Sequence, residues 1–385
     1  MKSAQTEVVP ATEEIKSFRV SVNQEALEDL RARLDRTRLP TKEPVDDWSQ
    51  GVPLSRAANL IEYWRTSYDW RRFEAQLNRF PHFRTLLDGL GIHFIHERSP
   101  HADALPIILT PGCPGSVAEF LEVVEPLSNP TAFDGSAGDA FHVVVPSLPG
   151  LAFSDKPAET GWNLPRIAKA WSSLMQRLGY DRWVAQGGDW GAGVTTALGH
   201  LVPAGLVGIH LNWQFVFPEH VPNDLSPDEQ RTVDGAKNFL GDGNGYFRQQ
   251  STRPQTIAYA GQAAWIYEKF YSWTDNNGSP EDALSVDQML DNISLYWFTN
   301  TAASSGRIYW ENKDASFSGG KLSLPVAATV FPHEIFRAPR SWAEQTYSNL
   351  IYWNEATRGG HFAAFEEPDV FVEEIRAAFR ALRSP

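Results

Sequence analysis

The sequence predicts an α/β fold in which helices cover both faces of a mostly parallel sheet. Short apolar runs alternate with helical stretches after about residue 85, as in successive βα units. Between residues 213 and about 320 the alternation stops and the chain becomes helical and aromatic, which indicates an insertion. The length of 385 residues suits a large core with added segments better than one small domain.

The chain ahead of the sheet predicts a tail and an extension. Residues 1–17 mix charged side chains with Pro10 and lack the apolar stretch of a signal peptide or membrane anchor, so we expect a loose tail. Residues 18–90 form an expected N-terminal extension, with a strand over 18–22 and a helix that ends at Pro40. Amphipathic segments between residues 48 and 83 are expected to wrap on another domain.

The core is expected in two parts, residues 91–212 and 321–385, separated by an inserted helical cap over 213–320. Expected core strands are residues 92–96, 106–109, 142–145, 183–186, 325–331 and 350–353. Expected core helices are residues 117–127, 163–178 and 368–382. This arrangement brings the loops after the parallel strands to one edge of the sheet, where a site is expected.

Charge and cysteine content narrow the classes of partner. The net charge is −13 and no basic run is present, which disfavours nucleic acid and anionic membrane surfaces as partners. Cys113 is the one cysteine, so no intramolecular disulfide and no zinc site built from several thiolates can form. We therefore expect a cytoplasmic protein, and a homodimer is compatible with the sequence.

The most informative motif is Gly187-Gly188-Asp189-Trp190-Gly191, which follows the expected strand 183–186 and precedes a helical stretch over 194–201. This is the pattern of a nucleophile elbow with aspartate in place of serine. Small residues are needed around the nucleophile because the sharp strand-to-helix turn crowds any Cβ. The alternative is a glycine-rich turn in which Asp189 is an ordinary helix N-cap.

A second motif, Thr110-Pro111-Gly112-Cys113-Pro114, follows the expected strand 106–109. In an α/β-hydrolase the loop at this place completes an oxyanion hole with a backbone amide. We expect the amides of Cys113 and Trp190 to serve, with a simple Pro/Gly turn as the alternative. The Cys113 thiol is expected to pack in the interior rather than to react.

The general base and its orienting acid are expected after the last strands. His361 lies in Arg358-Gly359-Gly360-His361-Phe362, behind the expected strand 350–353. Glu334 lies in Phe331-Pro332-His333-Glu334, at the end of the expected strand 325–331. The chain order is therefore nucleophile, acid, base. Glu355 is the rival acid. His93 and His96 are three residues apart in a strand and therefore point to opposite faces, which disfavours joint metal binding.

These motifs together resemble the microsomal-type epoxide hydrolases, and the match runs from about Phe18 to the C-terminus. Residues 30–34 and 70–73 resemble that family's wrapping extension, and the motifs around Asp189, Glu334 and His361 match its nucleophile, acid and base. The resemblance implies an α/β-hydrolase core with an inserted cap and no cofactor. It also implies two cap tyrosines that bind the epoxide oxygen, which local context assigns to Tyr246 and Tyr309 with four alternatives, Tyr259, Tyr267, Tyr271 and Tyr296.

One feature departs from the family. The oxyanion loop usually reads His-Gly-x-Pro, whereas this chain reads Pro111-Gly112-Cys113-Pro114. The catalytic amide belongs to the third residue and is kept. We expect the loop to lack the side-chain contacts that normally brace it, which would affect its rigidity and the rate more than the reaction class.

The expected activity is hydrolysis of an apolar or aromatic epoxide to a vicinal diol through an ester on Asp189, with the epoxide and water as partners. Cap aromatics are expected to bind the substrate, among them Trp213, Phe215 and Trp297. Two alternatives stay open. A haloalkane dehalogenase shares the aspartate nucleophile and the ester, and a non-catalytic binding protein could keep the same fold.

Overall fold

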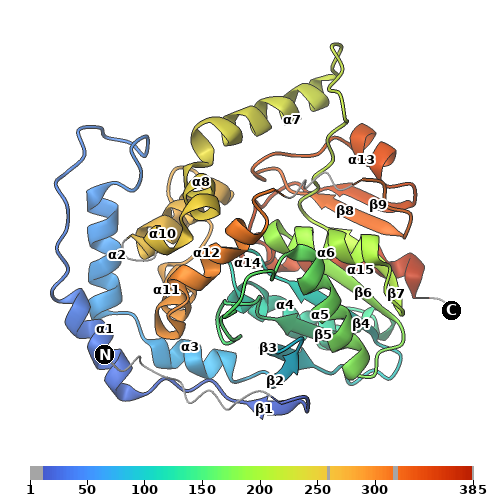
Figure 1. Cartoon of the computed structure of the whole chain (residues 1–385), viewed down its shortest axis with the longest axis horizontal. Coiled ribbons are helices and arrows are strands. Elements are labelled where there is room, and N and C mark those ends of the chain that lie inside the picture. Colours follow the sequence, from blue (N-terminus) through green and yellow to red (C-terminus); the bar gives the residue numbers. More distant parts are fainter. Residues whose placement is uncertain (1–11, 258–260, 315–319, 384–385) are drawn as a thin grey trace.

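The computed structural model describes residues 12–257, 261–314 and 320–383, and a nine-stranded sheet runs through this part of the chain (Figure 1). The strand order is β1-β2-β3-β5-β4-β6-β7-β8-β9. The strands from β5 to β9 are parallel, and β1, β2 and β3 pair antiparallel at one edge. The bounds are Lys16–Phe18, His82–Leu87, Leu90–Glu97, Leu105–Thr110, Phe141–Pro146, Trp183–Gly187, Leu206–Leu211, Val326–Val330 and Leu350–Glu355 for β1 to β9.

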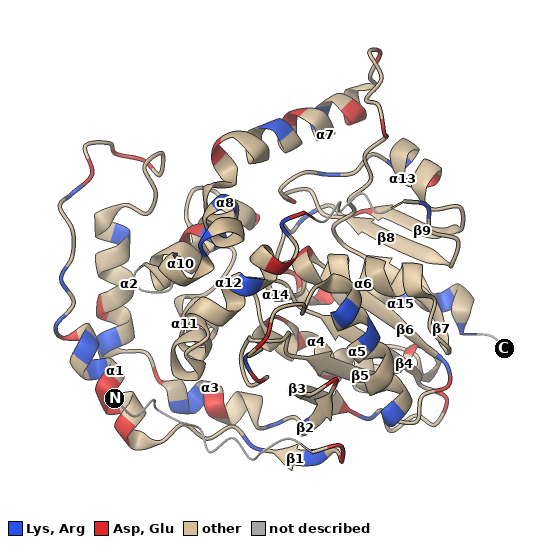
Figure 2. Ribbon diagram, in the orientation of Figure 1, with Lys and Arg blue, Asp and Glu red and all other residues tan. Residues whose placement is uncertain are grey.

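Helices cover both faces of this sheet, so its central strands are almost wholly apolar. One face carries α5 (Leu164–Arg177) and α6 (Asp189–Leu201), and the other carries α4 (Leu121–Ser128) and α15 (Pro368–Phe379). Figure 2 shows β4, β5 and β6 without charged residues, whereas acidic and basic residues are interspersed along the outer helices. Smaller core helices are η1 (Val117–Phe120), α13 (Arg340–Thr346) and α14 (Ala363–Glu366).

The insertion between β7 and β8 is helical and forms a cap beside the sheet (Figure 1). Its helices are α7 (Pro227–Asn238), η4 (Phe239–Gly243), α8 (Gly245–Thr252), α9 (Pro254–Ile257), α10 (Gln262–Trp273), α11 (Val286–Thr299) and α12 (Ala302–Glu311). Among the described residues, no helix is both long and apolar enough to cross a membrane.

The N-terminal extension holds the cap from outside. It contains α1 (Gln24–Leu34), α2 (Leu54–Thr66) and α3 (Trp70–Leu77), drawn in blue beside the cap in Figure 1. The Tyr68 hydroxyl donates to Asp291 Oδ1 on α11 over 2.9 Å, and the Arg72 guanidinium pairs with the same carboxylate at 2.5 Å. Because Asp291 is buried, these partners satisfy a charge that would otherwise be costly.

The start of the extension differs from the sequence prediction. The strand expected over residues 18–22 is instead the short β1, which ends at Phe18. The Val20 amide donates to Asn78 Oδ1 at 3.0 Å and the Val22 amide to Glu74 Oε1 at 2.6 Å. Side chains from the α3 region thus take the place of a strand partner. Helix α1 also ends at Leu34, well before Pro40.

The sequence pattern did not predict two of the strands, β2 and β7. β2 carries the polar residues His82, Arg84 and Thr85, which interrupt the apolar alternation although all three are buried. β7 pairs with β6, and Gly208 and His210 interrupt its apolar run. In the sheet, β2 lies between β1 and β3, and β7 lies between β6 and β8.

A buried chain of hydrogen bonds explains how His82 of β2 is accommodated in the interior. His82 Nε2 donates to the Leu77 carbonyl over 2.7 Å, so His82 Nδ1 must accept from His93 Nε2, 2.8 Å away. His93 Nδ1 then accepts from the Ser147 hydroxyl at 2.9 Å. Each ring carries one proton and is neutral. Burial lowers the pKa of His82 to about 4, from an ordinary value of 6.5.

The burial of neutral His82 predicts that the folded protein loses stability in acid. Because the folded pKa of His82 lies below the unfolded one, its neutral form stabilises the protein above pH 6.5, and the contribution is lost as the pH falls toward 4. The free energy of unfolding should lose about 3 kcal/mol from this group over that window. Denaturant unfolding of His82→Gln should show a correspondingly smaller pH dependence, whereas the exposed control His220→Gln should match the wild type. An unchanged slope in His82→Gln would contradict the assignment.

Candidate active site

Asp189 occupies a strained turn between β6 and α6. Its φ angle is +47°, in the left-handed region that residues other than glycine rarely adopt. The turn is also crowded, since a Cβ at Gly191 would lie 2.0 Å from the Thr110 carbonyl oxygen and one at Gly187 would lie 2.1 Å from the Gly191 oxygen. This strained and crowded turn has the geometry expected of a nucleophile elbow, which an ordinary helix N-cap does not require.

One carboxylate oxygen of Asp189 accepts a hydrogen bond from a backbone amide. The Cys113 amide donates to Asp189 Oδ1 over 2.7 Å. Trp190 follows Asp189 in the first turn of α6, and its ring lines the adjoining cavity. Burial raises the pKa of the Cys113 thiol to about 12, so this thiol stays protonated near neutral pH. At this position the backbone of Cys113 is available for chemistry and the thiol is not.

Glu334 and His361 complete a buried hydrogen-bonded triad. His361 Nδ1 lies 2.6 Å from Glu334 Oε1, and His361 Nε2 lies 3.2 Å from Asp189 Oδ2. Burial alone lowers the pKa of His361, but the two carboxylates outweigh it and raise the pKa to about 10. The resting histidine is therefore an imidazolium. The rival acid, Glu355, is exposed at the end of β9.

The loop that carries His361 is held by the core and by the cap. The His333 amide donates to the Gly359 carbonyl at 3.1 Å, which joins the acid loop to the base loop. The His361 amide donates to the Trp273 carbonyl at the end of α10 over 2.8 Å. Glu366 accepts from the amides on both sides of the base, Gly360 and Phe362, each at 3.0 Å. These bonds fix the ring that Glu334 orients.

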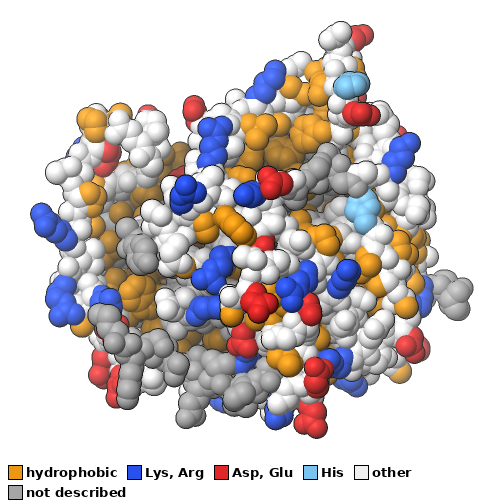
Figure 3. Space-filling model, in the orientation of Figure 1, with side chains coloured by type: hydrophobic (Ala, Val, Ile, Leu, Met, Phe, Trp, Pro, Cys, Tyr) orange, Lys and Arg blue, Asp and Glu red, His pale blue; other side chains and the backbone are white. Residues whose placement is uncertain are grey.

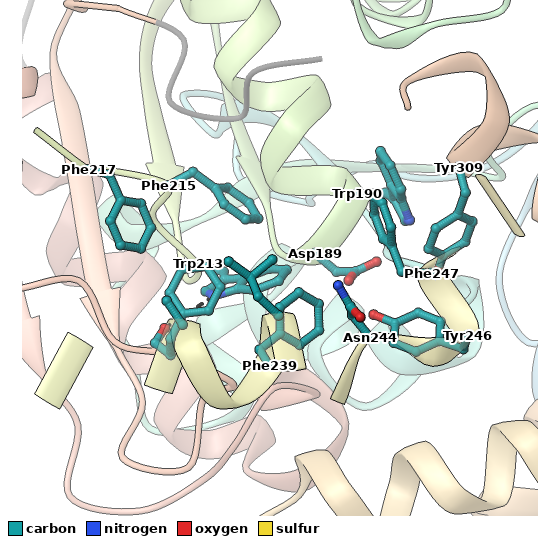
Figure 4. A pocket seen from close by; sticks show the side chains of 13 residues that line it. Asp189, Trp190, Trp213, Phe215, Phe217, Phe239, Asn244, Tyr246, Phe247 and Tyr309 are labelled. Atoms are coloured by element: carbon teal, nitrogen blue, oxygen red, sulfur yellow. Dashed lines mark hydrogen bonds between the residues drawn. The ribbon is translucent and has the colours of Figure 1, made fainter. Parts of the chain in front are cut away.

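The two expected tyrosines lie across the cavity from Asp189 (Figure 4). Tyr246 comes from α8, and Figure 4 shows its hydroxyl on the side of Asp189. Tyr309 comes from α12, packs edge-on against the Trp190 ring at 4.8 Å and donates to the Cys113 carbonyl over 2.7 Å. Burial raises the pKa of both phenols well above 10, so both remain neutral hydrogen-bond donors.

The alternative tyrosines are engaged elsewhere. Tyr267 donates to Glu281 at 2.6 Å, and Tyr271 stacks on Trp48 with ring centroids 3.8 Å apart. Tyr296 donates to the Gly115 carbonyl at 2.8 Å. Tyr259 lies outside the described residues.

The oxyanion loop is braced despite the proline at position 111. Asn292 on α11 donates to the Pro114 carbonyl over 2.8 Å and accepts from the Ser116 hydroxyl over 2.7 Å. Together with Tyr296 and Tyr309, it fixes the loop from the cap side. Cap residues thus make contacts with this loop that the comparison of motifs could not reveal, and the effect of Pro111 on the rate stays a prediction.

A cavity of about 360 Å³ opens in front of Asp189. Apart from Asp189, Asn244 and the two phenols its walls are apolar, and they include two of the three predicted substrate residues, Trp213 and Phe215. Figure 3 shows hydrophobic side chains gathered in a hollow beneath α7, whose C-terminal end supplies Ala236 to the wall. The remaining lining residues are Trp190, Phe217, Phe239, Leu240, Phe247 and Phe336.

The structure does not bring Trp297 to this cavity. The side chain is 39% exposed, packs edge-on against Trp64 at 6.3 Å and lines a separate cavity between the extension and the cap. The reason is helical rotation: its neighbour Tyr296 points to the oxyanion loop, so Trp297 turns away from it. Conversely, the sequence carried no signal for Phe239, Asn244 or Phe336 as wall residues. Among the described residues, no cluster of three or more His, Cys, Asp or Glu could hold a metal.

Two protein families match the N-terminal extension and the first part of the core. Residues 15–120 match the family described as "Epoxide hydrolase N terminus", and residues 106–211 match the "alpha/beta hydrolase fold" family. A protein of Stigmatella aurantiaca named "Putative epoxide hydrolase" is 66% identical over 96% of this chain and 86% of its own length. "Epoxide hydrolase 1" of Sus scrofa is 34% identical over 94% of this chain and 88% of its own.

Solved structures agree over the whole length. The juvenile hormone epoxide hydrolase of the silkworm Bombyx mori superposes with a TM-score of 0.87 at 27% identity and covers 97% of this chain and 96% of its own. The epoxide hydrolase of Aspergillus niger has a TM-score of 0.85 at 31% identity, with 96% and 97% covered. The extension, core and cap therefore match as one unit.

The triad geometry predicts which glutamate controls His361. Replacing Glu334 with glutamine removes a neighbouring charge that raises the pKa of His361, so this pKa should fall from about 10 by roughly one unit or more. NMR titration of ¹⁵N-labelled histidine, assigned with His361→Gln, measures the change. Glu355→Gln is the matched control and should leave the titration unchanged. The opposite pattern would reverse the assignment of the acid.

Proposed function

This chain belongs to the microsomal-type epoxide hydrolase family and is an epoxide hydrolase, and we propose that it opens apolar epoxides through a covalent ester on Asp189. One observation carries the proposal: the two oxygens of Asp189 have different partners. Oδ1 accepts from the Cys113 amide, and Oδ2 faces His361 Nε2. In an ester formed through Oδ2, Oδ1 becomes the carbonyl oxygen and already lies at the oxyanion hole.

Ring opening uses Asp189 and the two phenols. Asp189 Oδ2 attacks a ring carbon, the carbon–oxygen bond of the oxirane breaks, and Tyr246 or Tyr309 gives a proton to the leaving oxygen. Tyr309 exchanges its bond to the Cys113 carbonyl for one to the substrate. Because esterification removes the charge of Asp189, it also lowers the pKa of His361. The proton that His361 then releases replaces the one taken from the phenol.

Hydrolysis restores the resting state. Neutral His361, oriented by Glu334, takes a proton from water as the water oxygen bonds to Cγ of Asp189. The oxyanion is held by the amides of Cys113 and Trp190. The intermediate expels the diol oxygen, which takes the proton from His361. Asp189 then ionises, and its proton returns His361 to the imidazolium that its high pKa favours.

The cavity supports an apolar substrate of moderate size. Its volume of about 360 Å³ falls at the lower end of the range for small-molecule sites. Its apolar walls gain free energy by taking aryl or alkyl groups out of water. The phenols supply the polar contacts that would hold the oxirane oxygen over Asp189.

The dehalogenase alternative is less well supported by the cavity wall. Halide release needs indole N–H groups around the leaving ion, and of the two tryptophans that line the cavity, Trp213 donates its indole N–H to the Phe336 carbonyl at 3.2 Å. The neutral phenols favour an alkoxide leaving group that stays attached to the product. A purely binding role is contradicted by the relatives, which are named as enzymes at high identity.

The two phenols should be required for ring opening. Tyr309→Phe and Tyr246→Phe should each slow formation of the ester by about 30-fold to about 10³-fold, or about 2–4 kcal/mol, because each removes a donor to the developing alkoxide. Rapid-quench single turnovers with styrene oxide measure this step. Tyr271→Phe is the control, since Tyr271 stacks on Trp48 away from the cavity. A wild-type rate of ester formation in either variant would exclude that tyrosine as a donor.

A further inference from the structure

A second cavity adjoins Asp189, and its other lining residues differ from those of the apolar cavity. Its volume is about 20 Å³, room for about one water molecule. Asp189 is the one residue that lines both this cavity and the large apolar one. The nucleophile therefore separates a space fit for an organic substrate from a space fit for water.

Polar side chains line the small cavity, among them the triad residue His361. Glu119, Gln186, Asn212 and His361 all reach it. Gln186 is 1% exposed, and its Nε2 donates to Asn212 Oδ1 over 2.7 Å. Its Oε1 is buried and accepts no hydrogen bond from any described residue. Leaving such an oxygen unpaired costs about 1–3 kcal/mol, so a donor bound in the cavity would be stabilised.

Glu119 reaches the cavity from the oxyanion loop. Its Oε1 accepts from the Ser116 amide over 2.9 Å, in a capping box that starts η1. The chain makes space for this carboxyl, because a Cβ at Gly115 would lie 1.4 Å from Glu119 Oε1. Burial raises the pKa of Glu119 to about 8, although the charge of His361 opposes this, and the charge of Asp189 adds to the rise.

We propose that this small cavity binds the hydrolytic water, and that Glu119 and Gln186 hold the water between His361 and the ester carbonyl of Asp189. The proposal rests on the ester mechanism set out above. It assigns a separate binding site to the second substrate of the reaction.

The site meets the needs of the attacking water. The water oxygen forms a bond to Asp189 Cγ, one proton passes to His361 Nε2, and the other stays hydrogen-bonded to Glu119 or Gln186. The bond from Cγ to the alkyl oxygen then breaks, and that oxygen takes its proton from His361.

Glu119→Gln tests the proposal, because glutamine can still accept from the Ser116 amide and keep the capping box. Rapid quench with styrene oxide and intact-protein mass spectrometry follows formation and loss of the ester separately. Ester formation should proceed at the wild-type rate, and ester hydrolysis should slow at least tenfold, so that ester accumulates. Glu122→Gln, an exposed change on the next helix, should behave as the wild type.

The outcomes separate this proposal from the ester mechanism. Wild-type hydrolysis in a folded Glu119→Gln would overturn the water site while leaving the ester mechanism intact. If that variant does not fold, Gln186→Met replaces it, because this change removes the unpaired oxygen at similar volume. Gln186→Met should also form the ester at the wild-type rate and hydrolyse it at least tenfold more slowly, and wild-type hydrolysis in this variant would overturn the water site. Equal slowing of both half-reactions in the folded variants would also overturn it, since a water-holding group acts on hydrolysis alone. Failure of the wild type to form any ester would refute the mechanism instead.

Discussion

The buried pairing of one imidazolium with two carboxylates is the interaction on which the site depends. His361 lies between Glu334 and Asp189, at 2.6 and 3.2 Å, and none of the three is well solvated. Such a cluster needs hydrogen bonds that offset the cost of desolvated charges, and Glu334 Oε1 accepts a second one from the Ile335 amide at 2.7 Å. It also couples the two half-reactions, since esterification of Asp189 removes one of the charges that keep His361 protonated.

The core, the cap and the extension together hold the side chains of this cluster in position. Strand ends supply Asp189 and Glu334, whereas the loop of His361 depends on bonds from the cap through Trp273 and on Glu366. The cap in turn fixes the oxyanion loop through Asn292 and the cap tyrosines. The extension anchors the same cap helix at Asp291. A change far from Asp189 can therefore reach the site by loosening the cap.

Sequence patterns predicted those parts of the site that local geometry determines. Asp189, Glu334 and His361 follow strands, so their convergence follows from a parallel sheet. Tyr246 and Tyr309 came from family resemblance, because nothing in the sequence of the helical cap marks which of its six tyrosines faces the core. Trp297 was misplaced since one residue of helix rotation decides its direction. Glu119 carried the local signature of a capping box, but its proximity to Asp189 arises only in the folded chain.

The central claim is that Asp189 becomes an ester that only activated water can release. His361→Gln removes the base and leaves the nucleophile, so mixing this variant with styrene oxide should trap the intermediate. Intact-protein mass spectrometry should show a gain of one substrate mass, and peptide mapping should place it on Asp189. An unmodified variant after complete mixing with an epoxide that the wild type turns over would contradict the account.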